Sequence, residues 1–385
     1  MPMSESTFQR LPTFRLEDYF SRWEFTARHH LTASDAQSMS IGELLALGSD
    51  DDRAAFDTLG LGYVETRGGD PLREAVAATY DACEPQDILM FAGAEEAIFW
   101  VMQLAVEPGD HVIVPVPNYQ AFEAIPLAAG AEVTGVPLVD TESGWTIDLD
   151  DVRGALRPNT RVIGMNFPHN PTGAVLDPAR WQDLVDLCEE RGIRLVSDEV
   201  YRGVERDAAR RLPQAADLSP TAVSINVMSK AYGLPGLRVG WVASRDHAFL
   251  DLLERHKHYT SICNAGPSEF LATVALRAGD RIRDRNRDIV AANVPLVDDL
   301  FARYADLLSW HPPVGGSVAF ARYHGPEGAN RFCRELVEQA GVLLLPSEIY
   351  CTPLSDVPDR YFRIGVGRRS VPAGLTALDA HLGRR

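Results

Sequence analysis

Short apolar runs alternate with amphipathic stretches through the middle of the chain. Each run is apolar nearly throughout, which indicates a strand buried on both faces of a parallel sheet. The amphipathic stretches between most of them have the spacing of surface helices. We therefore predict an α/β fold with a mostly parallel seven-stranded sheet between helices. The predicted strands are residues 87–93, 111–116, 131–138, 161–167, 193–198, 222–228 and 238–244.

The pattern changes after about residue 280. A long helical stretch covers residues 281–308, with Pro295 as a point of bending, and short strands and two further helices follow it. This order predicts a smaller α+β domain. We expect a large domain over residues 46–280 and a small domain formed by residues 1–45 and 281–385. The N-terminal part of the small domain is expected to pack with the C-terminal part or to cover the site.

Polar and glycine-containing segments follow the predicted strands at their carboxyl ends. Open α/β sheets bind ligands beyond the carboxyl ends of their strands, so we expect these segments to form one site. They are Gly93 to Glu95, Asn118-Tyr119, Asn166 to Gly173, Asp198 to Tyr201, Ser229-Lys230 and Arg238.

The first of these segments, FAGAEEAIFW, has the pattern of a strand, a glycine turn and a helix. Amides in the first turn of such a helix can bind a phosphate group. An ordinary strand-to-helix turn explains the same residues, with Glu95 and Glu96 favouring the helix N-terminus. Their negative charge counts against a phosphate group, so both interpretations stay open.

Ionisable residues stand at the ends of two buried strands. Asp198 closes one of them, and a carboxylate there is costly without a cation, either a protonated pyridine nitrogen or the partner in a structural salt bridge. Lys230 follows the other and is surrounded by apolar residues and a Gly-rich loop. Desolvation lowers the pKa of such an amine and suits it to attack on a carbonyl group. Arg238, eight residues further on, can bind a phosphate group through two N–H groups.

The composition limits the class of protein. The chain has 385 residues and a formal net charge of −17, which disfavours binding to nucleic acid or to an anionic membrane. Five scattered cysteines without a CxxC pair predict neither a zinc site nor a disulfide framework, and they favour a reducing, cytoplasmic setting. The N-terminus has no signal-peptide pattern and no run of 18 apolar residues occurs, so we expect no membrane span.

Taken together, these features fit pyridoxal 5'-phosphate. This cofactor needs an amine for its aldehyde, an acid for its ring nitrogen, donors for its 3'-oxygen, and amides with cations for its phosphate group. The motifs NPTG, SDEVY and MSKAYGLPGLRVGW stand in the order and spacing of one family. The chain resembles, over nearly its whole length, the fold-type I pyridoxal-phosphate enzymes and specifically the class I and II aminotransferases related to aspartate aminotransferase.

The resemblance implies roles for residues at matching positions. Lys230 would form the Schiff base and carry the proton between Cα and the cofactor, while Asp198 would hold the ring nitrogen. Tyr119 would stack on the ring, and Asn170 and Tyr201 would form hydrogen bonds with the 3'-oxygen. The phosphate group would be bound by Gly93, Ala94, Glu95, Ser229 and Arg238, with Glu95 at a position that often holds an uncharged polar residue.

Two further residues extend the site implied by the resemblance. Arg363, in YFRIGVG, resembles the arginine that binds the substrate α-carboxylate bidentately, and Asn170 would also face the substrate. Tyr63, in LGYVETRGG, resembles the tyrosine that reaches the phosphate group of the neighbouring subunit. The active unit would then be a homodimer with shared active sites. A tyrosine buried in a connecting loop is the alternative interpretation of Tyr63.

The motifs predict the first steps of a reaction and leave its outcome open. An amino acid would replace Lys230 on the cofactor, and Lys230 would then remove the Cα proton. Transamination with a 2-oxo acid is the first hypothesis. Elimination followed by cyclisation is the second, because LEDYF and SDAQSMSIGELLAL resemble the capreomycidine-synthase-like subgroup, which cyclises a hydroxylated arginine. Glu24, Asp35 or Glu43 would then meet a guanidinium group, although each also fits a solvated helix face.

A regulatory, non-enzymatic function is a third alternative. Some relatives of this fold are fused to DNA-binding domains. The chain shows no added helix-turn-helix segment and has a net charge of −17, so we expect an enzyme.

Overall fold

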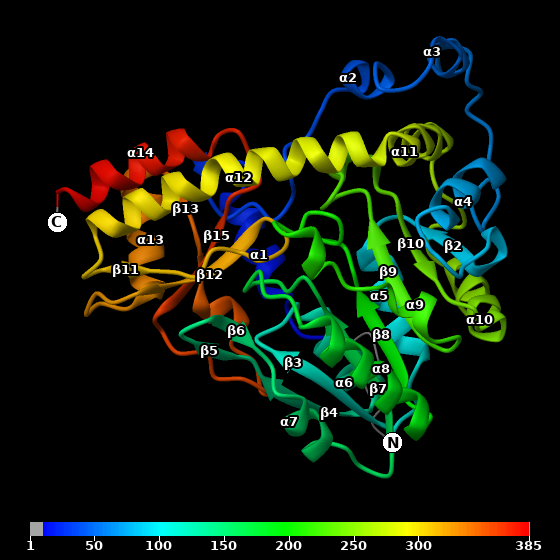
Figure 1. Cartoon of the computed structure of the whole chain (residues 1–385), viewed down its shortest axis with the longest axis horizontal. Coiled ribbons are helices and arrows are strands. Elements are labelled where there is room, and N and C mark those ends of the chain that lie inside the picture. The colour runs from blue at the N-terminus through cyan, green and yellow to red at the C-terminus, as the bar shows by residue number, and fades with distance from the viewer. Residues whose placement is uncertain (1–10, 385) are drawn as a thin grey trace, which may run out of the picture.

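The computed structural model describes residues 11–384. Its main feature is a seven-stranded sheet with helices on both faces (Figure 1). Neighbouring strands pair in parallel except β10, which is antiparallel to β2 and to β9. The strand order is β2 (Ile88–Phe91), β10 (Gly240–Ala243), β9 (Val223–Val227), β8 (Arg194–Asp198), β7 (Thr160–Asn166), β3 (His111–Val116) and β4 (Glu132–Pro137). The predicted sheet is confirmed, and each strand overlaps its predicted range.

Burial on both faces is the reason that these strands are apolar throughout. Every residue of β2, β3, β9 and β10 is buried, because helices cover the sheet on each side. The helices that belong to this part of the chain are α4 (Asp70–Ala77), α5 (Ala94–Leu104), α6 (Ala121–Ala129), α7 (Leu149–Gly154), α8 (Pro178–Arg191), α9 (Ala215–Leu218), α10 (His247–Lys257) and α11 (Gly266–Arg277).

Local chemistry determines where α8 begins and ends. Pro178 occupies its first turn, and the side chain of Asp177 accepts a hydrogen bond from the amide of Ala179. The helix ends at Gly192, whose φ of 63° is the left-handed conformation that glycine adopts without a Cβ clash.

A smaller antiparallel sheet follows α12 (Gly279–Arg303), the long helix that crosses the molecule in Figure 1. Its order is β11 (Leu308–Ser309), β12 (Val318–Tyr323), β15 (Tyr361–Gly365) and β14 (Leu345–Pro346), and it is accompanied by α13 (Ala329–Ala340) and α14 (Val371–Leu382). The N-terminal segment joins this part, because β1 (His29–His30) pairs in parallel with β13 (Val342–Leu343). The domain boundaries at residues 46 and 280 stay a prediction.

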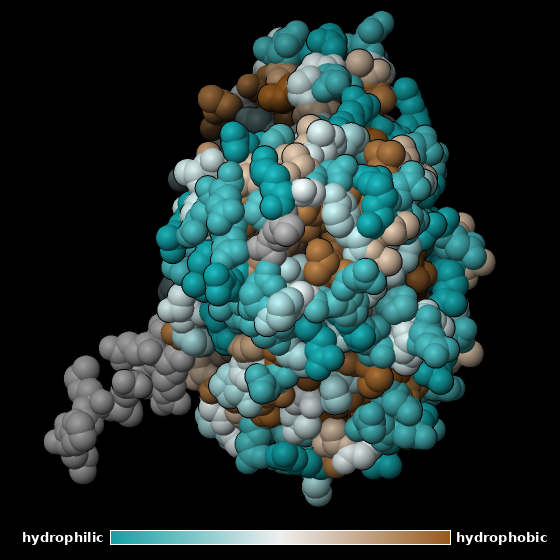
Figure 2. All heavy atoms as spheres, turned by 90° about the vertical axis from the view of Figure 1, so that its left-hand side faces the viewer, coloured by the Kyte–Doolittle hydropathy of each residue, from teal (hydrophilic) through white to brown (hydrophobic). Residues whose placement is uncertain are grey.

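The remaining elements lie at the edges of the molecule. α1 (Arg15–Trp23) is the first helix of the described residues, and α2 (Ile41–Leu45) and α3 (Asp50–Asp57) lie at the outer edge of the molecule in Figure 1, where they contact α11. A hairpin joins β5 (Val139–Thr141) to β6 (Gly144–Thr146). Hydrophilic side chains dominate the face shown in Figure 2. Within residues 11–384, no helix has the length and apolar character needed to cross a membrane.

Candidate active site

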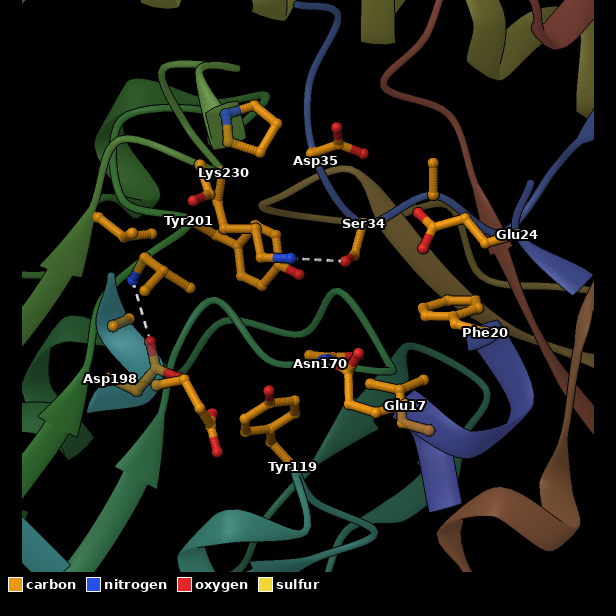
Figure 3. Close-up of a pocket in the computed structure, with 18 of the residues that line it drawn as sticks. Glu17, Phe20, Glu24, Ser34, Asp35, Tyr119, Asn170, Asp198, Tyr201 and Lys230 are labelled. Atoms are coloured by element: carbon orange, nitrogen blue, oxygen red, sulfur yellow. Dashed lines mark hydrogen bonds between the residues drawn. The ribbon is translucent and has the colours of Figure 1, made fainter. Parts of the chain in front are cut away.

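A cavity of about 840 Å³ opens at the carboxyl ends of β7, β8 and β9 (Figure 3). One wall consists of the loops that follow these strands, and α1 with the segment after β1 forms the opposite wall. The structure therefore brings the loops of the large sheet together with the N-terminal segment. The predicted site residues that line the cavity are Ala94, Glu95, Tyr119, Asn170, Asp198, Tyr201, Ser229, Lys230 and Arg238.

Lys230 extends into this cavity from the loop after β9. Its Nζ donates a hydrogen bond to Oγ of Ser34 at 2.7 Å. Burial lowers the pKa of the Lys230 ammonium, which increases the share of neutral amine available for a carbonyl group, while Asp35 acts in the opposite direction. The sequence contains only one other lysine, Lys257, and that side chain is buried elsewhere with its Nζ 3.3 Å from Oδ1 of Asn264.

Asp198 ends β8 and is 5% exposed. Its Oδ1 accepts a hydrogen bond from the amide of Val200 at 3.1 Å, but no lysine or arginine of the described chain lies within ion-pair distance. Burial raises the pKa of Asp198 to about 7. The structural salt bridge considered for this residue is absent from residues 11–384, which favours a ligand cation as its partner.

Two side chains of the cavity wall, Tyr201 and Asn170, have donor groups without an acceptor in the described part of the chain. The hydroxyl of Tyr201 is buried without a hydrogen-bond partner of standard geometry, and burial raises the pKa of Tyr201 to about 12, so the group remains protonated. Asn170 is nearly buried, and its Oδ1 accepts from Nη1 of Arg363 at 3.0 Å. The amide nitrogen of Asn170 has no acceptor among the described residues. Both side chains can therefore donate to a ligand.

Arg363 lies on β15 and is fully buried. Besides Asn170, it donates to the carbonyl oxygen of Thr32 at 2.8 Å and to the hydroxyl of Tyr350 at 3.3 Å. No carboxylate of residues 11–384 lies within 4 Å of this guanidinium group. Arg363 is not on the cavity wall itself but behind Asn170 and Phe20, whose ring centroid is 5.8 Å from its Cζ. A buried guanidinium group without a carboxylate fits a residue that binds the carboxylate of a ligand.

A cradle for an anion forms where α5 begins. Gly93 has a φ of 100°, and a Cβ at this position would lie 2.4 Å from Nη2 of Arg238. The guanidinium group of Arg238 thus faces the first turn of α5, and Ser229 lines the same cavity. Helix amides together with a guanidinium group suit a phosphate group, which favours the first of the two interpretations of this turn.

The two acidic residues at this turn, Glu95 and Glu96, have different roles. Glu96 accepts a hydrogen bond from the amide of Ala92 at 2.7 Å and so stabilises the start of α5. Glu95 lines the cavity, and its Oε2 is buried without a partner. Burial raises the pKa of Glu95 to about 7, which reduces the negative charge beside the cradle.

Tyr119 lines the cavity and lies across it from Lys230 in Figure 3. A cofactor ring bound between the two residues could stack on the ring of Tyr119. Its ring packs at a tilt against Phe14, with 5.2 Å between the centroids. Burial and the neighbouring Glu95 raise the pKa of Tyr119 well above its usual value.

Some sequence predictions are not met within this cavity. Tyr63 is 92% exposed and does not line it, so the alternative of a buried tyrosine is wrong. The idea that Glu43 meets a guanidinium group in this cavity is wrong as well, because Glu43 caps α2 by bonding with Ser40 and lies outside. Asp35 is present, but Arg368 already pairs with it at 2.7 and 2.9 Å.

The sequence analysis missed the residues that support Lys230 and Arg363. Ser34 contacts Lys230 across 196 positions of sequence, and Thr32 contacts Arg363 across 331. No motif marks Thr32 or Tyr350, and SDAQSMSIGELLAL, which begins at Ser34, gave no sign of a contact with Lys230.

Comparison with known proteins gives consistent matches over most of the chain. A family model described as "Aminotransferase class I and II" matches residues 50–373. Capreomycidine synthase of Streptomyces vinaceus is 31% identical over 97% of this chain and 95% of its own length. Arginine–pyruvate transaminase AruH of Pseudomonas aeruginosa is 32% identical over 77% of this chain and 78% of its own.

Solved structures agree with these matches. A PLP-dependent aminotransferase from Streptococcus suis superposes with a TM-score of 0.89 and 32% identity, over 97% of this chain and 98% of that one. The PLP-dependent cyclase OrfR superposes with a TM-score of 0.88 and 27% identity over the full length of both chains.

Proposed function

This chain belongs to the class I and II aminotransferases, enzymes that depend on pyridoxal 5'-phosphate, and from that premise we propose that it transaminates an L-amino acid in the cavity described above. The observation that carries the proposal is the arrangement of Lys230 and Asp198 around one cavity, with Arg363 buried beside it and lacking a carboxylate.

The side chains present fit the cofactor. When bound, pyridoxal phosphate supplies an aldehyde for amino groups and a ring that stabilises negative charge at Cα. Asp198 would hold the ring nitrogen, since its buried carboxylate lacks a cation. Tyr201 and Asn170 would donate to the 3'-oxygen, and the turn at Gly93 with Arg238 would bind the phosphate group.

The substrate would be oriented by Arg363 and deprotonated by Lys230. A bidentate contact from Arg363 would fix the α-carboxylate, assisted by Asn170, which already touches the guanidinium group. Lys230 would accept the Cα proton because burial lowers the pKa of its ammonium form. Lys230 would hold this proton between Cα and the cofactor, and one water molecule would be needed to release the 2-oxo acid and leave the amino group on the cofactor.

Elimination and cyclisation is the second candidate function. It is supported by the near full-length similarity to capreomycidine synthase and to the cyclase OrfR. Both functions use the same residues up to removal of the Cα proton. They differ in whether the amino group leaves the substrate.

One experiment distinguishes the two candidates. The purified holoenzyme is incubated with a panel of L-amino acids and either pyruvate or 2-oxoglutarate, and separately with 3-hydroxyarginine, and the products are analysed by mass spectrometry. Appearance of alanine or glutamate supports transamination. Loss of water from 3-hydroxyarginine with the amino group retained supports cyclisation, and absence of both products rejects both.

We also propose that the protein is a homodimer. Tyr63 is almost fully exposed in the single chain and lies outside its cavity, which supports a role at the cofactor phosphate of a second copy. A cytoplasmic location stays a prediction.

A further inference from the structure

Carboxyl groups outnumber lysine and arginine side chains on the cavity wall. Its carboxylates are Glu17, Glu24, Asp35, Glu95 and Asp198, and its cations are Lys230, Arg238 and Arg368. Arg368 is already paired with Asp35. Asp198, Lys230 and Arg238 stand at the proposed cofactor positions. Within residues 11–384, Glu17, Glu24 and Glu95 have no lysine or arginine within 4 Å.

The histidine beside Glu24 does not balance this charge. Nε2 of His30 lies 3.7 Å from Oε1 of Glu24. Burial, followed by the nearby Arg368, lowers the pKa of His30 to about 4, so the imidazole is neutral at pH 7. Its Nδ1 is buried without a hydrogen-bond partner, as is Oε2 of Glu95. Two unpartnered polar atoms in residues that line one cavity indicate a ligand that forms hydrogen bonds there.

Glu17 lies in α1, and Glu24 is the residue that caps its C-terminus. They are seven residues apart, which is close to two helical turns, and Figure 3 shows them with Phe20 on the side of the cavity opposite Lys230. Phe20 links this face to Arg363, since its ring centroid is 5.8 Å from the Cζ atom. If Arg363 held the α-carboxylate of a substrate, a side chain that passed beside Phe20 would lead towards Glu17 and Glu24.

We propose that the cavity accepts L-amino acids whose side chain ends in a cation, an ammonium or guanidinium group, and that Glu17 and Glu24 determine this specificity. The inference rests on the proposed function and adds its substrate class. Phe20 contacts the aliphatic part of such a side chain. The carboxylates of Glu17 and Glu24 accept hydrogen bonds from the N–H groups at its end. The same negative charge repels a second carboxylate, so the amino acceptor is a 2-oxo acid with one carboxylate, such as pyruvate, in preference to 2-oxoglutarate.

The test compares L-arginine with L-citrulline, its neutral counterpart of the same length. Single-turnover conversion by the holoenzyme is followed by absorbance, and kcat/KM is obtained for both amino acids. We expect the wild type to prefer arginine by at least tenfold, and Glu17→Gln and Glu24→Gln each to reduce the ratio about tenfold. Asp18→Asn is the matched control, because it removes one charge from an exposed residue of the same helix that is not on the cavity wall.

A binding measurement separates this inference from the proposed function. Calorimetry with the Lys230→Ala variant, which cannot remove the Cα proton, should give a Kd for arginine at least tenfold below that for citrulline. If no amino acid reacts in the wild type, the proposed function fails, and the calorimetric ratio still decides the inference. Equal affinities, or an arginine preference that survives both glutamine substitutions, would overturn it.

Discussion

Lys230 differs in its chemistry from the arginines that supply most of the positive charge of this protein. The chain has only two lysines, and the rest of its strongly basic side chains are arginines. A guanidinium group cannot give up its proton in a protein, so arginine cannot serve as a base or form a bond with an aldehyde. Lysine can do both once burial lowers the pKa of its ammonium group, as it does for Lys230. The second lysine, Lys257, is buried away from the cavity.

Reduction with borohydride should attach the cofactor to Lys230 alone. Peptide mapping by mass spectrometry is simple because Lys257 is the only other lysine. Lys230→Ala should lose the label and reduce kcat/KM by roughly a thousandfold or more, the range expected on losing a general base. Lys257→Met is the control and should keep the label. A label on Lys257, or one that persists in Lys230→Ala, would show that the assignment is wrong.

The pH dependence of stability should reveal Asp198 in the cofactor-free protein. Its pKa is about 7 in the folded chain, against an ordinary value of 3.8, so the folded state binds more protons between these values. Stability therefore falls as pH rises from about 4 to 7, and Asp198 accounts for at most on the order of 4 kcal/mol of that fall. Glu95 and Glu199, also raised to about 7, act in the same direction.

Urea unfolding at pH 5 and pH 8 measures this effect. Asp198→Asn should lose less stability than the wild type between the two values, and Asp183→Asn, on the exposed face of α8, should behave as the wild type does. Adding the cofactor to the wild type should also reduce the loss, because a ring-nitrogen cation stabilises the charged carboxylate. An identical loss in Asp198→Asn and in the wild type would contradict the account of Asp198.

At the scale of elements, the active site depends on how strand ends meet helix starts. β2 leads through Gly93 into α5, so the first-turn amides of that helix face the guanidinium group of Arg238. On the other side, β1 pairs with β13 and brings the segment with Ser34 over Lys230. Neither the β2–α5 side nor the β1–β13 side contains a complete site. The cavity exists only because the N-terminal segment is anchored between the two sheets.

Gly93→Ala should weaken cofactor binding more than it weakens the fold. A Cβ at this position would lie 2.4 Å from Nη2 of Arg238, and the φ of 100° is strained for alanine. Gly109→Ala is a matched control, since Gly109 has a φ of 90° and open space around its Cβ position. Both variants should lose roughly 1–3 kcal/mol from backbone strain. Only Gly93→Ala should raise the Kd of pyridoxal phosphate, by about tenfold or more in a fluorescence titration, and an equal change in both would sink this explanation.

At the scale of the whole molecule, the segment with α2 and α3 packs on the body through α11, with Leu44 and Leu45 buried in the core. α3 has no buried residue, and the chain that follows exposes Leu61 at 87% and Tyr63 at 92%. In Figure 1 both helices lie at the outer edge of the molecule. Large apolar side chains exposed on this segment favour contact with another protein surface, and a second copy of this chain would supply one.

Mixing two inactive variants tests whether Tyr63 acts on the neighbouring subunit. Tyr63→Ala removes the tyrosine from both sites of a dimer, and Lys230→Ala removes the lysine from both. In a mixed dimer, one site combines Lys230 of one subunit with Tyr63 of the other and should regain activity, up to a quarter of the wild-type value at equal mixing. No recovery after subunit exchange, checked by native mass spectrometry, would show that Tyr63 does not act across an interface.

The sequence by itself determined the large sheet and the part of the site that lies at its edge. Buried strands are apolar on both faces, so their runs can be recognised locally, and Asp198 and Lys230 are marked by standing at the ends of such runs. The tertiary structure decided what local patterns cannot contain. It placed Ser34 on Lys230 and Thr32 on Arg363, left Glu17 and Glu24 without a cation, and moved Glu43 out of the site. These outcomes depend on contacts between residues far apart in the chain. The local sequence around a charged residue on a helix is the same whether that helix faces solvent or a cavity.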